Sequence, residues 1–481
     1  MKMPPDFPSN AQDWEMTPLA MRTLVVLLWQ ENRALKRHLY HLQGQVGKLG
    51  EQVNKNSQNS SKPPSSDITG KNNCPKKESS GKLKGGQAVY KGTGRRLKPL
   101  EQVKKVVVIR LIACAECGAL FLVDDLHPQR HQVSELPRIE PNIVEYQRHT
   151  LTCLVCGGNN QPEWSEAMPK GRYGKQTQAL IAYLDGRIGM SQRDMEEALA
   201  TVFHVEIGLG SILAQEQIGS QALKEPFEKA EEYAREQKVI IADETSCHEL
   251  AKLCWMWVCV TSSVTFSRIF KGRGSKKAKE FLGENFTGIL GSDRYKPYNW
   301  VDLSQRQICW AHLKHDFQAL VERCCKPVII GRRLLEQLKM FFVLWHRFKD
   351  GLLPWSDFHS AMQAIRHDVC CLLTIGTFVN YAQTWKTCQN IIQLKQALWT
   401  FVNKEEVEPT NNDTERSLKR SVIWRRRSFG TQSEKGSCFV ERILTTVAAL
   451  HQQKRDILDY IVEAYREYRL GCSTPALLTV C

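Results

Sequence analysis

Two aspartates in the middle of the chain each end a short apolar run, and a glutamate stands near the head of a basic stretch. Asp243 ends "KVIIAD", Asp293 ends "TGILGSD", and Glu415 lies in "NNDTERSLKR". Carboxylates are the ligands that Mg²⁺ or Mn²⁺ prefers, and a pair of such ions suits phosphodiester attack by water or a 3′-hydroxyl. These three acids are therefore candidate catalytic residues and metal ligands.

Six cationic side chains follow Glu415 within a dozen residues. Lys419 comes four residues after Glu415 and so shares its helical face, where it can bind a phosphate beside the metal. A solvated helix with ordinary salt bridges is the alternative. As candidate DNA-binding residues we take Arg416, Lys419, Arg420, Arg425, Arg426 and Arg427.

The elements around the two aspartates are expected in the order strand, strand, strand, helix, strand. Both acids would stand at the carboxyl ends of apolar strands, and neighbouring strands are about 4.8 Å apart, so the side chains can converge. Asp293 follows Asp243 by 50 residues and Glu415 follows Asp293 by 122. The second gap fits a helical insertion over 326–403. Taken singly, an acid at a strand end is more often a turn former or a cap.

The segment "CWAHLKH" places Cys309 and His312 three residues apart. The pair could bind a metal, but such residues more often pack and hydrogen-bond beside a site, so we expect a supporting role. His312 or His315 could also contact phosphate.

Two C-x-x-C pairs, each next to a glycine, suggest a second kind of metal site. "CAECGA" contains Cys114 and Cys117, and "CLVCGG" contains Cys153 and Cys156. Four thiolates make a closed tetrahedral zinc site, so we expect structural Zn²⁺ in a small β domain, with "RIEPNIVEYQRHTLT" as a candidate ribbon. Disulfides or a redox pair are the alternatives.

Leucines near the N-terminus follow a heptad, with Asn32 at one a position. The seam runs through Leu28, Asn32, Leu35, Leu39, Leu42, Val46, Leu49 and Val53. It predicts a self-pairing coiled coil, and the alternative is one amphipathic helix on the protein's own core. A Ser-, Asn- and Pro-rich linker follows, and then a flexible arm with twelve Lys and Arg against two acids between Lys71 and Arg110.

Composition limits the class of protein. The 481 residues are 42% hydrophobic and carry a net charge of +15, which indicates a globular protein with a polyanionic partner such as nucleic acid. No apolar run is long enough to span a membrane, and "MKMPPDFPSNAQDWEMT" lacks the apolar core of a signal peptide. With 17 cysteines and no disulfide framework, we expect a reducing cytoplasm in which most cysteines act as small buried apolar residues.

The segment from Tyr173 to Gln237 has a helical pattern. Within it, "MSQRDMEEALATVFHVEIGLGSILAQEQ" reads as helix, turn, helix, with Ser191 as N-cap. A DNA-reading motif and plain packing are equal alternatives.

These pieces together resemble the transposases of the insertion-sequence sixty-six family (TnpC type). The matching stretches are the leucine seam with "NSSKPPSSD", the "GGQ" arm, the paired knuckles, "ADET", "SDRYKPY", "CWAHLKHDF" and "NNDTERSLK", in family order over about residues 21–450. Departures are "AVYKGTGRR" after "GGQ", the irregular "HVEIGLGSIL" and a tail that matches nothing.

The resemblance implies an α/β, RNase H-like DDE core with a helical insertion, whose triad maps to Asp243, Asp293 and Glu415. It implies a DNA transposase with Mg²⁺ (or Mn²⁺) and Zn²⁺, acting on double-stranded DNA at element ends and targets. We then expect a bacterial cytoplasmic protein associated with the nucleoid, which forms a homodimer or higher through the leucine seam. Members of the family often act with accessory proteins of the same element. A zinc-dependent DNA-binding regulator and an RNase H-like nuclease are the alternatives. The expected domains are a coiled coil (21–56), a basic linker (57–100), a zinc-binding domain (101–160), a helical domain (161–235), the first core part (236–325), the insertion (326–403) and the final core helices (404–470).

Overall fold

The structure is a computed structural model, and it describes residues 11–54, 97–121, 125, 128–164, 171–323 and 326–478. The chain divides into two compact units. The larger comprises Met1–Lys71, Glu166–Met195 and Gly208–Cys481, and the smaller comprises Asn72–Ser165 and Glu196–Ile207. The basic linker predicted over 57–100 lies almost entirely outside the described residues.

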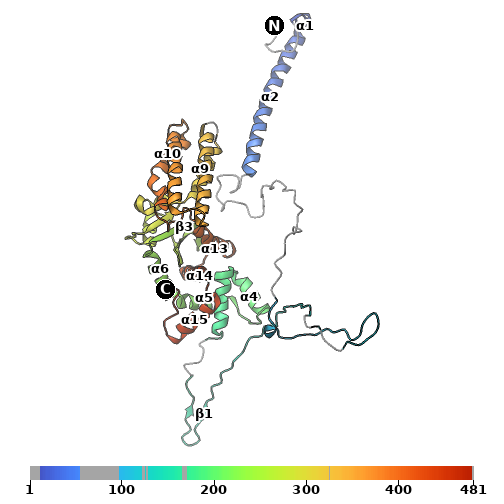
Figure 1. The fold of residues 1–481 in the computed structure, drawn as a ribbon, viewed down its shortest axis with the longest axis vertical. Coiled ribbons are helices and arrows are strands. Elements are labelled where there is room, and N and C mark those ends of the chain that lie inside the picture. The colour runs from blue at the N-terminus through green and yellow to red at the C-terminus, as the bar shows by residue number, and fades with distance from the viewer. Residues whose placement is uncertain are drawn as a thin grey trace. The chain divides into compact units, whose positions relative to one another are not determined.

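A five-stranded mixed sheet forms the centre of the larger unit (Figure 1). Its strands stand in the order β5-β4-β3-β6-β7; β3, β4 and β5 are antiparallel neighbours, whereas β6 and β7 run parallel to β3. The bounds are β3 (Val239–Glu249), β4 (Lys252–Val260), β5 (Thr265–Phe270), β6 (Ile289–Ser292) and β7 (Arg306–Ile308). The expected order is confirmed, with helix α7 (Ser275–Leu282) before β6, and β7 is a strand that the sequence analysis did not expect.

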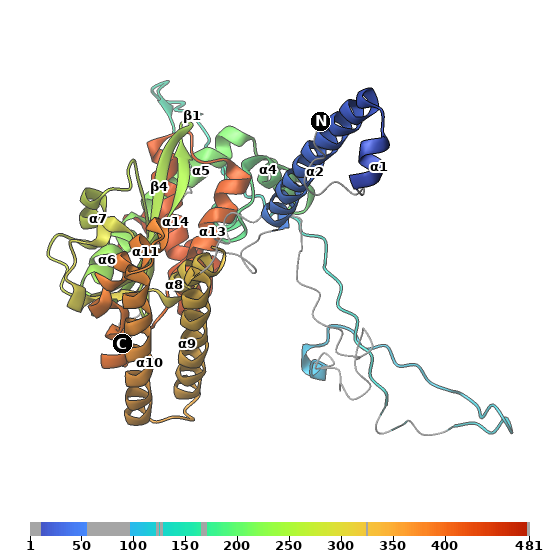
Figure 2. The same cartoon turned by 90° about the horizontal axis from the view of Figure 1, so that it is seen from above.

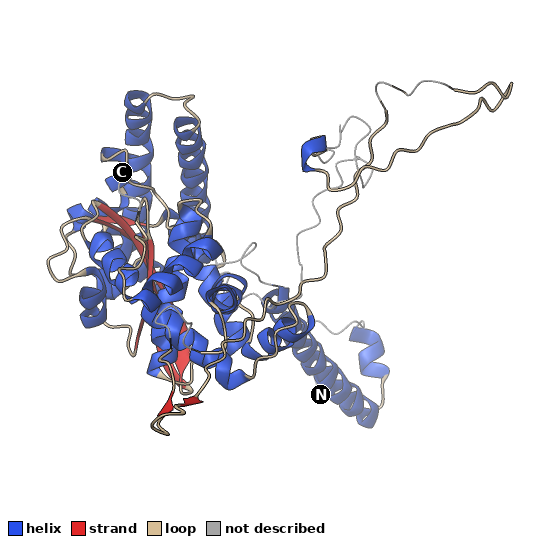
Figure 3. Ribbon diagram, turned by 90° about the horizontal axis from the view of Figure 1, so that it is seen from below, coloured by secondary structure: helices blue, strands red, loops and turns tan. Residues whose placement is uncertain are grey.

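Side chains of β4 alternate between two cores, as the period of a strand requires. Trp257 and Cys259 belong to the core that also holds residues of α6 (Lys224–Arg235), α7 and α15 (Ile457–Leu470). Met256 and Val258 belong to a second core with Leu418 of α13 (Asn412–Ser428). The sheet is therefore buried on both faces, and Figure 3 shows helices surrounding it.

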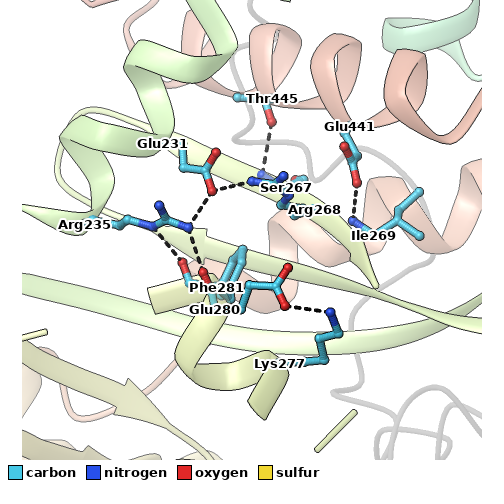
Figure 4. A network of polar contacts seen from close by, with 10 residues as sticks. All are labelled: Glu231, Arg235, Ser267, Arg268, Ile269, Lys277, Glu280, Phe281, Glu441 and Thr445. Atoms are coloured by element: carbon cyan, nitrogen blue, oxygen red, sulfur yellow. Dashed lines mark hydrogen bonds and ion pairs between the residues drawn. The ribbon is translucent and has the colours of Figure 1, made fainter. Parts of the chain in front are cut away.

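Side chains of helix α14 (Glu434–Gln452) accept hydrogen bonds from the backbone at the outer edge of the sheet. The backbone N–H groups of β5 at Ser267 and Ile269 donate to the side chains of Thr445 (3.0 Å) and Glu441 (2.6 Å), as Figure 4 shows. Glu231 of α6 accepts from Arg268 on the same strand. An edge strand with unpaired N–H groups would be open to pairing with another chain, and here side chains cover it.

The predicted helical insertion is present as a helical layer with its own core. Its helices are α9 (Lys326–Lys349), α10 (Trp355–Thr377), α11 (Ala382–Ile392) and α12 (Thr400–Asn403), and they pack with α8 (Trp310–Val321), which precedes the predicted insertion. Trp310, Phe341 and Trp399 are buried together, with the rings of Trp310 and Trp399 4.7 Å apart. α9 and α10 lie side by side in Figures 1 and 2. The Trp- and Phe-rich composition of this segment is thus explained by core packing.

The N-terminal segment forms α1 (Ala11–Met16) and one continuous helix, α2 (Leu19–Asn54). Leu28, Leu35, Leu39 and Leu42 of the heptad seam are 54–64% exposed. The leucine seam is therefore not covered by the chain's own core over these positions. Self-pairing of α2 stays a prediction.

The segment 97–164 of the smaller unit contains little regular structure. Its described strands are β1 (Leu151–Thr152) and β2 (Asn159–Asn160), which pair with each other, and a 3-10 turn spans Leu100–Gln102. Of the ribbon expected around "RIEPNIVEYQRHTLT", only the last two residues form a strand, β1, and apolar side chains such as Leu136 and Ile143 remain more than 80% exposed. An extended segment without a facing layer has no core against which to bury these side chains.

Helices α3 (Lys175–Tyr183), α4 (Gln192–Thr201) and α5 (Leu209–Ala222) confirm the helical pattern predicted between 173 and 237. A π-helical turn (η3, Leu184–Ile188) extends α3. Ser191 accepts a hydrogen bond from Asp194 N (3.2 Å), as its predicted capping role requires. α5 packs against α15 so closely that a Cβ on Gly219 would lie 2.1 Å from the Tyr465 hydroxyl. This face of α5 is a packing surface.

Candidate active site

The register of the parallel strands places the two predicted aspartates side by side. Ile241 of β3 pairs with Gly291 of β6, so two residues further on Asp243 comes level with Asp293. Ser292 of β6 pairs with Ile308 of β7, which brings Cys309 to the same level on the next strand. Asp293 directly follows the end of β6, as expected, but the expectation that Asp243 ends its strand is wrong, because β3 continues to Glu249 in its pairing with β4. The two aspartates come together all the same, through the parallel register of β3 and β6.

Two side chains at the start of α13 attach this helix to β3. Asn411 Nδ2 donates to Asp243 Oδ2 (3.3 Å), and Thr414 Oγ1 donates to the Ile241 carbonyl (3.2 Å). Cys309 fixes Asn411 in turn, because its thiol donates to Asn411 Oδ1 (2.9 Å) and its Sγ accepts from Asn411 N (3.3 Å). Glu415 is thereby held in the first turn of α13, near the aspartates.

His312 lies among the three acids. Its Nδ1 is 3.7 Å from Glu415 Oε1, beyond hydrogen-bond distance. Burial lowers the pKa of His312, but the hydrogen bond with Cys309 and the negative charges of Asp293 and Asp243 outweigh the effect of burial and raise that pKa to about 10. His312 is thus a cation at neutral pH, placed where the carboxylates gather.

The carboxylates repel one another. Burial, followed by the charges of Glu244 and Asp293, raises the pKa of Asp243 to about 7. Crowded oxygen ligands of this kind fit a divalent cation in chemical type. As they stand, however, no three His, Cys, Asp or Glu side chains in the described ranges form a ready metal-binding group. Asp243, Asp293 and Glu415 gather around His312 without closing on one point.

A second group of residues braces the aspartates, and sequence reasoning missed it. Arg273 pairs with Glu244 (2.7 Å), the neighbour of Asp243, and its guanidinium lies over the rings of Trp255 (4.4 Å) and Tyr295 (4.0 Å). Tyr295 N donates to Asp293 Oδ1 (2.8 Å). This brace joins the β3 acid pair to the loop that carries Asp293. Nothing in the local spacing of these residues signals it.

The predicted DNA-binding cations on α13 fall into two sets. Arg425 Nη1 donates to the Ser246 carbonyl and to Ser246 Oγ (2.8 Å), and Arg427 Nη1 donates to the Gly189 carbonyl (3.2 Å). Both therefore have partners within the protein.

The other set borders two grooves. Arg416, Lys419 and Arg420 line a groove of about 310 Å³ between α13 and the turn around Gly186, and Arg416 and Arg420 also line one of about 460 Å³ beside the β4–β5 turn. Arg426 is exposed on the same helix. Arg416 also donates from Nε to the Asn412 carbonyl within its own helix (3.4 Å). DNA binding by these four residues stays a prediction.

Both predicted cysteine knuckles have the local geometry of a metal-binding turn. Gly118 N donates to the Cys114 carbonyl (3.0 Å) and Gly157 N donates to the Cys153 carbonyl (2.8 Å). Both glycines have positive φ, +73° and +71°. Backbone N–H groups, from Cys117 and from Cys156 respectively, are the main cause that lowers the pKa of Cys114 and of Cys153. Each pair fits half of a zinc site in donor type, but the structure does not bring the two pairs together.

Comparison with known families assigns the chain. It belongs to the Transposase IS66 family, whose model matches residues 170–438, and this confirms the resemblance found in the sequence. Residues 11–96 match a family of unknown function (DUF6444). No curated protein matches the chain. Over the described part of the chain, no helix has both the length and the apolar character needed to span a bilayer.

Proposed function

We propose that this protein is a DDE-type transposase that cleaves DNA at the ends of an insertion sequence and joins them to a target, with divalent metal ions. The main observation behind this proposal is that Asp243 of β3 and Asp293, directly after β6, lie side by side. Asn411 binds Asp243 and so attaches to this pair the helix start that bears Glu415. Family membership supports DNA as the substrate. The fold supports the proposal too, since an α/β sheet with a helical insertion matches the RNase H-like core that the resemblance implies.

Asp243, Asp293 and Glu415 would hold Mg²⁺ or Mn²⁺. When bound, the ions supply activation of the attacking oxygen and stabilisation of the leaving one. The chain's own residues orient these ligands: Asn411 holds Asp243, and the Arg273 brace holds the loop of Asp293. His312, as a cation, offsets repulsion among the acids. Arg416, Lys419, Arg420 and Arg426 would bind the DNA backbone.

The test is mobility of the whole native element, accessory genes included, with Glu415→Gln compared with Glu405→Gln. Glu405 is exposed and lies ten residues before Glu415. We expect Glu415→Gln to bind end DNA and fail to move the element, while Glu405→Gln behaves as wild type. Equal mobility of both variants would show that Glu415 is not a ligand.

Binding and cleavage assays with purified protein distinguish the proposed transposase from the two alternative functions. End binding without cleavage in Mg²⁺ or Mn²⁺ would favour the regulator. Cleavage without strand transfer would favour the nuclease.

We also propose that the four knuckle cysteines hold structural Zn²⁺. Removing zinc from the full chain with a strong chelator should unfold the region from Cys114 to Cys156, because metal binding contributes folding free energy there. Limited proteolysis before and after chelation measures this unfolding, with Cys370→Ser/Cys371→Ser as a control that leaves the knuckles intact. Unchanged protection of that region in zinc-free protein would refute the zinc proposal.

A further inference from the structure

A groove separate from those beside α13 lies between α8 and α9. Its volume is about 720 Å³, and its lining includes Lys314 and Gln318 of α8 together with Arg332, Lys339, Phe342 and His346 of α9. It shares no residue with the two grooves that border α13. Figures 1 and 2 both show α9 extending away from α13.

The charge of this groove is predominantly positive. Lys314, Arg332 and Lys339 line it and are exposed, and Glu336 is its single acidic lining residue. No ion pair within the described ranges neutralises these three cations. Exposed cations without acidic partners suit an anionic partner such as a DNA backbone.

The spacing on α9 suits a linear array of phosphates. Arg332, Lys339 and His346 are each seven residues apart, so they lie along one face of the helix. Seven residues of α-helix rise about 10.5 Å, which is close to three base pairs at about 3.4 Å each.

The groove begins close to the catalytic residues. His312, which lies beside Glu415, is on α8, and Lys314 and Gln318 follow it at a helical rise of about 3 Å and about 9 Å. DNA that reaches the acids therefore comes within a few base pairs of the groove.

We propose that the α8–α9 groove binds the phosphate backbone of the DNA on the far side of the scissile phosphate from the element end. This rests on the proposed function, because strand transfer needs two DNA segments at one centre. Arg416, Lys419, Arg420 and Arg426 on α13 would hold the element end. The α8–α9 groove would hold the other segment, which is flanking DNA before cleavage and target DNA during joining.

The experiment compares Arg332→Gln/Lys339→Gln with Arg333→Gln/Arg347→Gln in the full-length protein. The control pair is exposed on the same helix, removes the same charge and does not line the groove. Affinity is measured for element-end DNA that carries a flank and for the same end cut flush. We expect the groove variant to lose the extra affinity given by the flank and to bind the flush end as wild type does.

Salt dependence gives a quantitative check. The loss of two phosphate contacts lowers the slope of log affinity against log salt concentration by about 1.8. The ratio of wild-type to variant affinity for flanked DNA should therefore fall about tenfold between about 50 mM and about 200 mM salt. Two activity assays separate flank from target: cleavage of flanked ends, and joining of pre-cut ends to target. Loss of cleavage alone assigns the groove to the flank, loss of joining alone assigns it to the target, and loss of both assigns it to each in turn.

Three outcomes would overturn the groove assignment. They are equal losses in the two variants, an equal loss on flush and flanked ends, and wild-type affinity for both ends together with wild-type joining to target. If the wild-type protein neither cleaves nor joins DNA, the proposed function fails. The flank-dependent affinity still decides separately whether the groove binds DNA.

Discussion

Arg425 and Arg426 are neighbours in the sequence, but their guanidinium groups have different surroundings. Arg425 is half-buried and donates to Ser246 and to Thr245 Oγ1 (3.2 Å) on β3, whereas Arg426 is exposed. At the scale of single residues, a run of three arginines thus combines a structural contact with a surface charge.

Replacing the two arginines separately should divide stability from DNA binding. Arg425→Gln should lower the free energy of unfolding by about 1–3 kcal/mol, because it removes charge-assisted hydrogen bonds to partly buried acceptors. Arg426→Gln should change stability by less than about 0.5 kcal/mol and reduce DNA affinity and its salt slope. Denaturant unfolding and salt-dependent DNA binding measure the two effects. Equal behaviour of the two variants in both assays would contradict this division.

A buried pair of acids, Asp185 and Glu216, should make stability depend on pH. Burial, then the charge of Asp185, raises the pKa of Glu216 to about 8, and burial raises that of Asp185. The folded protein keeps protons that the unfolded chain releases above about pH 4. The stabilisation is therefore complete below that pH and is lost as the pH rises towards 8.

Glu216→Gln should flatten this dependence. Gln192 Nε2 donates to Glu216 (3.2 Å) and can donate equally to a glutamine amide oxygen. We expect the slope of unfolding free energy against pH to fall by up to about 1.4 kcal/mol per pH unit, measured by urea unfolding between about pH 5 and pH 8. Exposed Glu232→Gln is the control. The same slope in both variants would mean that the Asp185–Glu216 pair does not hold the protons.

At the scale of elements, α14 replaces the missing strand at the edge of β5. Two neighbouring threonines on this helix are fully buried, but they differ in hydrogen bonding. Thr445 Oγ1 accepts from Ser267 N, whereas Thr446 Oγ1 makes no hydrogen bond to the described residues. Comparing substitutions of these two threonines therefore measures how much the hydrogen bond at this sheet edge contributes to stability.

Thr445→Val should destabilise the protein by about 1–3 kcal/mol, since it leaves the buried N–H of Ser267 without an acceptor. Thr446→Val should be neutral or stabilising, because it removes a buried hydroxyl that has no partner. Thermal or urea unfolding compares the two nearly isosteric changes. A larger loss for Thr446→Val than for Thr445→Val would show that the edge bond contributes little.

At the scale of the whole molecule, the exposed leucines of α2 lead us to predict self-association through this helix. Leu35 and Leu39 are 64% and 56% exposed and lie on the heptad seam with Leu28 and Leu42. A monomer would leave this apolar stripe in water, and each leucine buried in a paired helix contributes about 1.5–3 kcal/mol. Pairing of two α2 helices is the arrangement that removes it from water.

Leu35→Lys/Leu39→Lys should convert a homodimer or larger assembly into a monomer, raising the dissociation constant by at least about a hundredfold. Light scattering during gel filtration measures the mass. Ala34→Lys/His38→Lys is the matched control, because both residues are exposed, lie off the seam and have the same spacing. A monomeric wild type, or equal dissociation by the control, would rule out the coiled coil.

The sequence by itself determined the features that depend on neighbouring residues. The apolar run ending in Asp293 predicted a strand end, Ser191 predicted a helix start, and each C-x-x-C-Gly predicted a tight turn. These succeed because backbone propensity and side-chain period are local properties. The acids of the candidate site could therefore be proposed from their local patterns, and the family resemblance maps its triad onto the same three positions, with Glu415 as the third.

Only the tertiary structure decided how these residues meet. The Asn411 contact to Asp243 joins positions 168 residues apart, and the Arg273 brace joins three elements. The different roles of Arg425 and Arg426 depend on which face of α13 lies on β3, and no local pattern specifies that. The ribbon expected before Cys153 failed because a strand pattern folds only when another layer is present to bury it. Long-range contacts, set by packing and not by spacing, determined the rest.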